Sequence, residues 1–430
     1  MKKMSVIHIE PFRCSMAEVT VPGSKSYTQR ALVAASLARG SSVLVNPLLS
    51  EDTMRIIEAL QAMGLGVAIE NGDIRIEGAG GVLSAPQNPI YLGNNGTAMR
   101  FLVSLSSLGR GPVTLTGDAR LCERPIRPLM NYLGLLGVPY RYLGQDGFPP
   151  VEIHASGLRG GELTIKNTES SQYISSIMLA APYADNPVTL TLEGGIVSRP
   201  YIDMTLQVMT DFGVPAEVKK KDCYTFPAKT AYQGRRYVIE GDASSASYFF
   251  LAAMLCEGTV RVNNLTPRST QGDLKFLDLL EGVGGEVRYG DNWISVTGKK
   301  MKEGRLVVSM ADMPDMVPTV AILAAFREGT TEIRRVAHLR IKESNRLAVL
   351  VAELGKMGID AREEGDSLVI VGGKPNGATI HTYNDHRIAM SFAVAGLVIP
   401  GISIQNPGCV DKSFPDFWKI FEELRGGERD

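Results

Sequence analysis

The chain has 430 residues, 45 basic against 46 acidic side chains, and five cysteines. One hydrophobic core rarely extends over such a length, so two or three domains are expected. The balanced charge excludes the basic surplus that is typical of nucleic-acid-binding proteins, and the short apolar runs exclude a membrane-spanning helix. The N-terminus has no apolar signal core, and the cysteines are scattered, so we expect a cytoplasmic protein with reduced thiols.

A short strand followed by a helical stretch recurs six times along the chain. The apolar, mostly β-branched strands begin at residues 43, 113, 188, 260, 331 and 403. Self-similarity at a nearly fixed period indicates one supersecondary unit that has been copied several times. The stretches after Ser42 and Thr259 match best, at an offset of half the chain, so we expect two domains of three units each.

Each unit also contains a polar helix start that leads into an apolar helix. Ser, Asn and Asp at a helix start cap free backbone N–H groups, and such an end attracts anions. Several cations stand at or just inside these starts, which indicates a shared anionic ligand: Lys25, Arg30, Arg100 and Arg387. The six starts are at residues 23–26, 93–97, 169–172, 241–245, 313–315 and 383–387.

Strands and helices alternate within each unit, which is typical of the α/β class. We expect units of the form βαβαββ, whose helices pack inward as an apolar core and whose sheets lie outside. The sequence contains neither a Gly-x-Gly-x-x-Gly dinucleotide turn nor a Gly-x-x-x-x-Gly-Lys-Ser/Thr loop. Its cysteines and histidines are too dispersed for a zinc site, so no metal is expected.

Three arginine-bearing segments, at residues 123–128, 340–346 and 385–387, carry chemistry that suits an anion site. Guanidinium groups bind carboxylate and phosphate oxygens in pairs, so a small ligand that carries both groups would suit them. Solvated surface ion pairs are the alternative for any one segment alone. Asp315 and Glu343 lie within polar starts, where they are either a general base and acid or partners in ion pairs.

Two further features are ambiguous. Ser170, Ser171 and Gln172 offer two hydroxyls and an amide at a helix start, where they either cap the helix or bind a ligand. Cys122 lies two residues before Arg124 and could be a nucleophile, although a buried or incidental thiol is the simpler interpretation.

Nine motifs, taken in order, resemble those of the 5-enolpyruvylshikimate-3-phosphate synthase family. They extend over nearly the whole chain: PGSKS at 22–26, GNNGTAMR at 93–100, ERPI at 123–126, SSQY at 170–173, SRPYID at 198–203, GDASSASY at 241–248, KESNR at 342–346, DHR at 385–387 and KSFPD at 412–416.

The resemblance implies two domains, each of three βαβαββ units with pseudo-threefold symmetry, which is an inside-out α/β barrel. The chain would cross between the domains twice, so that residues 1–20 join residues 240–430 and residues 21–239 form the second domain. The active site would lie in the cleft between the domains. We expect a monomer whose partners are small molecules.

The family reaction transfers the enolpyruvyl group of phosphoenolpyruvate to the 5-hydroxyl of shikimate 3-phosphate and releases phosphate. It proceeds by addition and elimination through a tetrahedral intermediate, without a metal or an organic cofactor. The resemblance therefore implies a transferase of the shikimate pathway, which leads to chorismate and the aromatic amino acids, and a target of the herbicide glyphosate. Cations must neutralise the carboxylate and phosphate groups in a closed, dry site.

Carried over motif by motif, the resemblance implies a role for each of the following residues. The catalytic residues would be Lys25, Asp315 as the base at the 5-hydroxyl, and Glu343 as the acid that protonates the methylene carbon. The shikimate 3-phosphate ligands would be Lys25, Ser26, Arg30, Ser170, Ser171, Gln172, Ser198, Tyr201, Asp315, His338 and Lys342. The phosphoenolpyruvate ligands would be Lys25, Gly96, Arg124, Gln172, Arg346, Arg387 and Lys412.

Several positions depart from the family pattern. His338 stands where the family commonly has Asn, Asn95 replaces a frequent Ala, Phe101 a frequent Pro, and Asn345 a frequent Asp. The segment 312–318 matches only loosely, so Asp312 is a rival to Asp315 as the base. Asp315 is preferred because Met-Pro-Asp at a helix start fits the Ile-Pro-Asp of the family.

Two other functions remain open. An enolpyruvyl transferase that acts on UDP-N-acetylglucosamine shares the fold and the donor, but its mobile loop carries a cysteine where this chain has Ala119. A non-catalytic repeat protein that binds anions would need neither Asp315 nor Glu343. Release of phosphate, assayed with each acceptor in turn, discriminates among the three functions.

Overall fold

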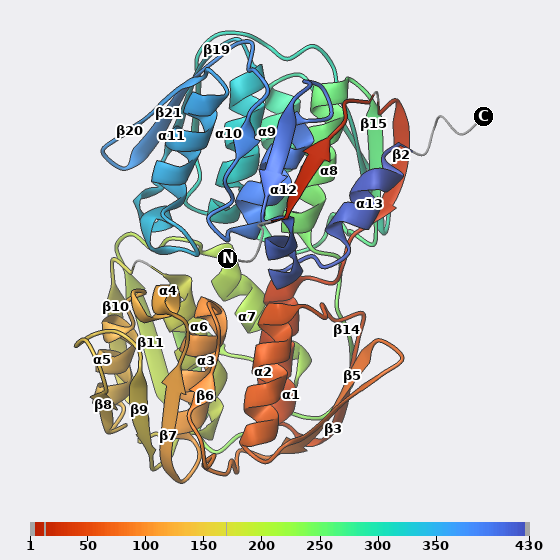
Figure 1. Ribbon diagram of the computed structural model, residues 1–430. Coiled ribbons are helices and arrows are strands. Elements are labelled where there is room, and N and C mark those ends of the chain that lie inside the picture. The colour runs from red at the N-terminus through yellow and green to blue at the C-terminus, as the bar shows by residue number, and fades with distance from the viewer. Residues whose placement is uncertain (1–4, 13, 169, 426–430) are drawn as a thin grey trace. The chain divides into compact units, whose positions relative to one another are not determined.

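The computed structural model describes residues 5–12, 14–168 and 170–425 (Figure 1). The chain divides into two compact units. Unit 1 contains Met1–Pro22 and Glu240–Asp430, and unit 2 contains Gly23–Ile239. The chain therefore passes from one unit to the other twice, once after Pro22 and once after Ile239.

Unit 2 contains three four-stranded sheets of the same connectivity. In each sheet the first two strands are parallel, and the remaining neighbours are antiparallel. In spatial order the sheets are β14 (Arg236–Val238), β3 (Arg39–Val45), β5 (Asp73–Ala79) and β4 (Gly66–Glu70); β6 (Ile90–Tyr91), β7 (Gly111–Thr116), β9 (Val151–Ala155) and β8 (Tyr140–Tyr142); and β10 (Gly161–Lys166), β11 (Val188–Glu193), β13 (Cys223–Phe226) and β12 (Glu217–Lys220).

Two kinds of helix accompany these sheets. The helices that precede the central strands are buried almost all round: α1 (Lys25–Leu37), α3 (Gly96–Ser107) and α6 (Ser171–Ala180). The helices that follow the central strands bury one apolar face, as amphipathic helices do: α2 (Glu51–Ala62), α5 (Arg127–Leu135) and α7 (Pro200–Asp211). Each sheet with its two helices is a βαβαββ unit, so this prediction from the sequence is confirmed.

Unit 1 repeats the same plan, although one of its sheets has three strands. Its sheets are β2 (Met16–Thr20), β15 (Thr259–Asn263), β17 (Trp293–Thr297) and β16 (Glu286–Tyr289); β18 (Leu306–Ser309), β19 (Gly329–Arg334), β21 (Ser367–Gly372) and β20 (Asp360–Glu364); and β22 (Thr379–Ile380), β23 (Ile402–Gln405) and β1 (Val6–Ile9). The buried helices are α8 (Ala243–Cys256), α10 (Val317–Phe326) and α12 (His386–Ala395), and α9 (Phe276–Gly282), α11 (Arg346–Lys356) and α13 (Phe417–Glu423) follow the central strands.

The remaining described helical segments are short. They are α4 (Ala119–Cys122) and the 3-10 turns η1 (Ala181–Tyr183), η2 (Gly272–Lys275), η3 (Pro314–Met316), η4 (Ala337–Ile341) and η5 (Pro407–Lys412). In the described part of the chain, no helix combines the length and the apolar character that crossing a membrane requires.

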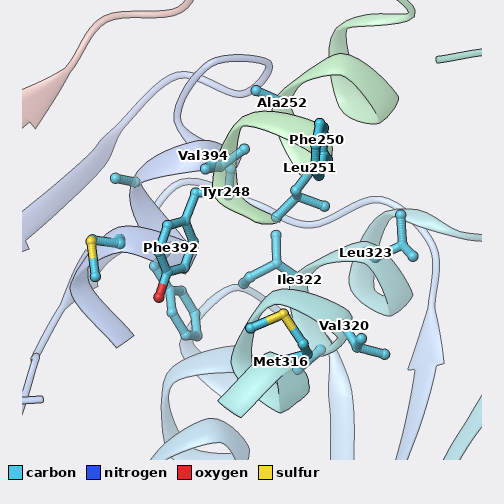
Figure 2. Packing of buried hydrophobic residues seen from close by; sticks show 14 of the residues in the cluster. Tyr248, Phe250, Leu251, Ala252, Met316, Val320, Ile322, Leu323, Phe392 and Val394 are labelled. Carbon is cyan, nitrogen blue, oxygen red and sulfur yellow. The ribbon is translucent and has the colours of Figure 1, made fainter. Parts of the chain in front are cut away.

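The core of unit 1 forms where its three buried helices meet. Figure 2 shows side chains of α8, α10 and α12 packed together, among them Leu251, Ile322 and Phe392. Small hydroxyl side chains occupy equivalent positions of these helices, and Thr319 Oγ1 lies 3.2 Å from Ser247 Oγ and 3.4 Å from Ser391 Oγ. Each of these pairs is separated by 72 residues, so the sequence repeat corresponds to a spatial repeat around the helices.

Two strands, β2 and β14, do not pair within the repeat whose buried helix follows them along the chain. Strand β2 precedes α1 along the chain, yet it pairs with β15 of unit 1 in the place that precedes α8. Strand β14 precedes α8 along the chain, yet it pairs with β3 of unit 2 in the place that precedes α1. The last strand before each crossing therefore belongs to a sheet of the unit from which the chain departs: β2 to a sheet of unit 1 and β14 to a sheet of unit 2.

An asparagine with a left-handed backbone holds each crossing segment. Asn264 (φ 57°) follows β15, donates from its side-chain amide to the Val21 carbonyl at 2.7 Å and accepts from the Val21 N–H at 3.3 Å. Asn46 (φ 53°) follows β3 and donates to the Ile239 carbonyl at 3.0 Å. Asparagine tolerates this backbone region better than most residues do, so it combines the sharp turn with a side-chain hydrogen bond.

The variants Asn264→Ala and Asn264→Gly test this role. Alanine loses both side-chain hydrogen bonds and strains the backbone, so we expect a loss of about 2–4 kcal/mol in the free energy of unfolding. Glycine loses the same hydrogen bonds without strain, so its loss should be smaller by about 1 kcal/mol. Urea unfolding followed by circular dichroism measures both, and equal losses would show that the backbone conformation contributes nothing.

Candidate active site

The polar helix starts of unit 2 are capped by neutral side chains. Ser24 accepts from the Tyr27 N–H at 3.5 Å, Asn95 from the Ala98 N–H at 2.9 Å, and Ser170 from the Gln172 N–H at 3.3 Å. Each cap takes up one backbone donor of the first turn without adding a charge of its own. Glu169, which precedes the third cap, lies outside the described residues.

The polar starts of unit 1 carry carboxylates instead. Asp242 accepts from the Ser245 N–H at 2.7 Å, and Asp385 accepts from the Arg387 N–H at 3.0 Å. The start before α10 is η3, where Pro314 occupies the first position and Asp315 the second. The starts of unit 1 therefore carry carboxylates, whereas the three capping side chains of unit 2 are neutral.

The central group of unit 1 is the guanidinium of Arg346, whose side chain is only 1% exposed. It donates from Nε to Asp385 Oδ2 at 2.9 Å, from Nη1 to Asp315 Oδ1 at 3.0 Å and from Nη2 to Glu343 Oε2 at 2.9 Å. Burial opposes the charged form of Arg346, but the three carboxylates raise its pKa above the usual range. One arginine thus holds carboxylates from the starts of α10, α11 and α12 together.

Asp315 bridges two arginines in this group. In addition to the contact with Arg346, its Oδ2 accepts from Arg387 Nη2 at 2.7 Å. Burial raises the pKa of the Asp315 carboxyl, but Arg387, Arg346 and Lys342 outweigh burial and hold the pKa well below its usual range. The structure therefore brings together four of the residues proposed from the sequence, and it leaves Asp315 ionised.

The rival carboxylate Asp312 lies elsewhere. Its side chain is 41% exposed and pairs with Lys275 at 2.8 Å. A carboxylate that is this exposed and already paired contributes little to the electrostatics of a buried group. Asp315 is the better candidate for a base.

Unit 1 also places buried side chains around this group that the sequence did not single out. Arg387 donates from Nη1 to Tyr248 Oη at 3.3 Å, and burial raises the pKa of Tyr248 to about 12. Ser344 donates to Asp385 at 2.9 Å. Asp273 accepts from Ser244, and burial together with the nearby charge of Asp315 raises its pKa to about 7. Ser244 and Tyr248 lie in the motif at 241–248, and Ser344 lies in the motif at 342–346, but the sequence analysis assigned them no role. Asp273 lies in none of the motifs.

His338 and the two lysines of unit 1 lie on short turns. His338 belongs to η4, Lys342 follows η4, and Lys412 ends η5, where it is buried. Burial and the charge of Lys342 lower the pKa of His338 to about 3, so the imidazole is neutral. Its Nε2 is buried and has no hydrogen-bond partner among the described residues. The segment 342–345 is a loop ahead of α11.

In unit 2, Arg30 organises the residues around the first polar start. It is 1% exposed and donates to Thr205 Oγ1 at 2.8 Å, to the Ser26 carbonyl at 2.9 Å and to the Tyr201 carbonyl at 3.1 Å. Burial lowers the pKa of Arg30 to about 10. These contacts hold Ser26 and Tyr201 at fixed positions, and they direct Arg30 towards the protein interior. Lys25 pairs with Asp52 at 3.3 Å.

The second and third starts of unit 2 are joined by Gln172, which donates from Nε2 to Thr97 Oγ1 at 2.9 Å. Arg124 is buried and donates from Nη1 to the side-chain oxygen of Asn94 at 3.3 Å. A β-carbon built on Gly96 would lie 2.5 Å from Arg124 Cζ, so the missing side chain lets the guanidinium approach the backbone. Ser171 and Ser198 are buried at the starts of α6 and α7.

The residues proposed from the sequence are thus distributed over both units. Unit 2 contains Lys25, Ser26, Arg30, Gly96, Arg124, Ser170, Ser171, Gln172, Ser198 and Tyr201, and unit 1 contains Asp315, His338, Lys342, Glu343, Arg346, Arg387 and Lys412. Within the described residues, no cluster of His, Cys, Asp and Glu has a geometry that could hold a metal ion. Cys122 is half-buried, and its thiol lies 3.8 Å from the Gly117 carbonyl.

Comparisons with known proteins agree on one family. The family model described as EPSP synthase (3-phosphoshikimate 1-carboxyvinyltransferase) matches residues 13–421. The chain is 42% identical over 420 residues to the 3-phosphoshikimate 1-carboxyvinyltransferase of Syntrophobacter fumaroxidans, covering 97% of this chain and 99% of the relative. It is 43% identical over 409 residues to the 3-phosphoshikimate 1-carboxyvinyltransferase of Methanoregula boonei, covering 94% of this chain and 96% of the relative. The solved EPSP synthase of Acinetobacter baumannii is similar with a TM-score of 0.80, at 27% identity and 98% coverage of both chains.

The buried, neutral His338 generates a prediction on pH. Below about pH 6.5 the unfolded chain binds a proton at this imidazole that the folded protein does not bind until about pH 3, so the wild type loses stability as the pH falls. His338→Asn removes this titration. Its stability relative to wild type should therefore rise by about 1–2 kcal/mol between pH 8 and pH 5. Urea unfolding at several pH values measures the difference, and a constant difference would contradict the assignment.

Proposed function

Because the chain belongs to the EPSP synthase family, we propose that it is a 3-phosphoshikimate 1-carboxyvinyltransferase, which transfers the enolpyruvyl group of phosphoenolpyruvate to the 5-hydroxyl of shikimate 3-phosphate and releases phosphate. One observation carries the proposal beyond family membership. Asp315 and Glu343, a base and an acid in the proposed reaction, are held by the same guanidinium of Arg346.

The proposed chemistry needs one base and one acid on the same pair of substrates. Asp315 removes the proton of the 5-hydroxyl while the oxygen attacks C2 of the enol, and Glu343 donates a proton to C3. The tetrahedral intermediate then loses phosphate from C2 and a proton from C3, which restores the enol. Lys25, Arg124, Arg346, Arg387 and Lys412 neutralise the phosphate and carboxylate groups of the donor, which is the electrostatic contribution to the rate.

Asp315 is a weak base as long as two guanidinium groups hold it. The donor brings a carboxylate that competes for Arg346 and Arg387, because guanidinium groups bind carboxylates in pairs. When these donors turn towards the substrate, Asp315 loses part of its stabilisation and its pKa rises towards the range in which a carboxylate accepts a proton. Binding of the donor thus activates the base.

The proposed ligands of the acceptor in unit 2 are Lys25, Ser26, Arg30, Ser170, Ser171, Gln172, Ser198 and Tyr201. Those in unit 1 are Asp315, His338 and Lys342. The neutral hydroxyl-rich caps of unit 2 suit a phosphate dianion, since they add no negative charge. His338 offers one N–H donor without a charge of its own. The proposal includes no metal and no organic cofactor, and a monomer in the cytoplasm.

The direct test measures phosphate release from phosphoenolpyruvate with shikimate 3-phosphate and, separately, with UDP-N-acetylglucosamine. We expect turnover with the first acceptor only. Turnover with the nucleotide sugar would assign the chain to the sister reaction, and binding of both anions without turnover would leave a non-catalytic protein.

Acid and base variants separate the roles of the carboxylates. Glu343→Gln and Asp315→Asn should each lower kcat by a factor of roughly 10² to 10⁴, because a positioned proton donor or acceptor is lost while the shape remains. Asp312→Asn is the matched control, and it should stay within about twofold of wild type because Asp312 is exposed and paired with Lys275. A severe loss in Asp312→Asn with a mild loss in Asp315→Asn would reverse the assignment.

Gly96→Ala tests the donor subsite and the inhibitor glyphosate. The added carbon would lie 2.2 Å from Arg100 Nη1 and 2.5 Å from Arg124 Cζ, so the guanidinium groups must move and the subsite becomes shorter. The longer inhibitor should suffer more than the compact donor, with a rise in its inhibition constant of roughly ten- to a hundredfold. Competitive inhibition assays on both proteins compare this rise with the change in the KM for phosphoenolpyruvate. Equal factors would mean that the methyl group harms the whole subsite without discrimination.

A further inference from the structure

Arg100 is a buried cation without a described counter-charge. It lies on α3, one turn after Gly96, and is 2% exposed. Its guanidinium donates from Nη2 to the Pro125 carbonyl at 3.3 Å and lies over the ring of Tyr173 at 5.8 Å. Its Nε and Nη1 are buried and have no hydrogen-bond partner among the described residues. Such a charge is costly to bury, so its position calls for a ligand that neutralises it.

The unpaired side of this guanidinium faces the first residue of α3. Arg100 Nη1 lies 2.2 Å from the point where a β-carbon of Gly96 would stand, and Arg124 Nη2 lies 2.5 Å from the same point. Two guanidinium groups therefore converge on Gly96. The side chain of Asn95 takes up the N–H of Ala98, which leaves the first N–H groups of the helix for another acceptor.

Two buried arginines of unit 1 differ in this respect. Arg346 and Arg387 are neutralised by carboxylates of the same unit. Among the described residues, the Arg100 guanidinium donates only to the Pro125 carbonyl. Arg100 therefore offers an incoming anion a positive charge that no carboxylate of the described residues is seen to neutralise.

We propose that Arg100 is a further anion-binding residue, which together with Arg124 and the first N–H groups of α3 binds the phosphate group of the donor and the inorganic phosphate released from it. Donors that converge from two side chains and a helix end suit a tetrahedral oxyanion. The identity of the donor rests on the proposed function, whereas the binding of inorganic phosphate does not.

This role predicts two effects of opposite sign. Removing the charge of Arg100 weakens phosphate binding, because charge-assisted hydrogen bonds are lost. The same change leaves the melting temperature of the ligand-free protein equal or higher, because a buried cation without a counter-charge is removed. A purely structural arginine would show the reverse, with a lower melting temperature and unchanged phosphate affinity. The Pro125 carbonyl keeps a donor in either case, since the Tyr173 hydroxyl donates to it at 2.8 Å.

The experiment compares Arg100→Met with Arg327→Met in the full chain. Arg327 is a matched control because it is also buried, also has an unpartnered Nε and donates only to the Thr331 hydroxyl and the Gly304 carbonyl among the described residues. It follows the C-terminal end of α10, whereas Asp315 lies at the other end. Calorimetry with inorganic phosphate and steady-state kinetics with phosphoenolpyruvate give the affinities, and thermal unfolding without ligand gives the stability.

We expect Arg100→Met to raise the Kd for inorganic phosphate and the KM for phosphoenolpyruvate by roughly ten- to a hundredfold. Arg327→Met should change neither by more than about twofold. An unchanged Kd in Arg100→Met, or an equal rise in both variants, would overturn the proposal. A fall in melting temperature or a failure to fold would contradict the claim that the charge is unneutralised, and Arg100→Lys, which keeps a charge but loses the fork, then tests binding alone.

The same measurements separate this inference from the proposed function. Phosphate binding that depends on Arg100 in a chain without turnover would support the inference and refute the function. Turnover with an unchanged KM for phosphoenolpyruvate and an unchanged Kd for inorganic phosphate in Arg100→Met would support the function and refute the inference.

Discussion

The arrangement of unit 1 depends on one interaction, the fork of Arg346 with Asp315, Glu343 and Asp385. A guanidinium that is 1% exposed must be neutralised within the protein. Because the group is planar, its N–H groups donate to carboxylates only in fixed directions. The three carboxylates come from the starts of three consecutive helical segments, so the fork sets how these starts lie relative to one another. The positions of the proposed base and acid follow from this constraint, because both carboxylates are bound to the same cation.

The two units use one architecture for different chemistry. Both are built from βαβαββ repeats with buried helices whose starts are polar. The caps are Ser24, Asn95 and Ser170 in unit 2, whereas Asp242 and Asp385 are caps in unit 1. A neutral cap keeps the positive helix end available for an anion, whereas a carboxylate occupies it and attracts arginines instead. Under the proposed function, this difference at one phase of the repeat suits unit 2 to anion binding and unit 1 to proton transfer.

The sequence predicted what depends on local pattern and failed where distant segments decide. The strands at a period of about 72 residues and the caps were visible because both are short-range signals. The hydrogen-bond partners of Arg30 were not visible in the sequence, because Thr205 is 175 residues away along the chain. Periodicity alone also cannot tell that β14 pairs with β3, because any strand of the repeat has the same pattern. The buried Tyr248 and Asp273 resemble ordinary core and turn residues in the sequence, and only the fold brings them beside Arg387 and Ser244.

Under the proposed function, the ion pairs of Asp315 would allow an anionic donor and a carboxylate base to share a site. An isolated Asp315 would repel the donor, whereas Arg346 and Arg387 partly offset the charge of Asp315. The arginines can turn from the protein carboxylate to the substrate carboxylate without either charge becoming unpaired in a dry environment, because each guanidinium has several donors. Under the proposed function, exchange of partners links binding to basicity. The strength of the resting ion pairs is then a condition of catalysis, since it keeps the base inactive until the donor has arrived.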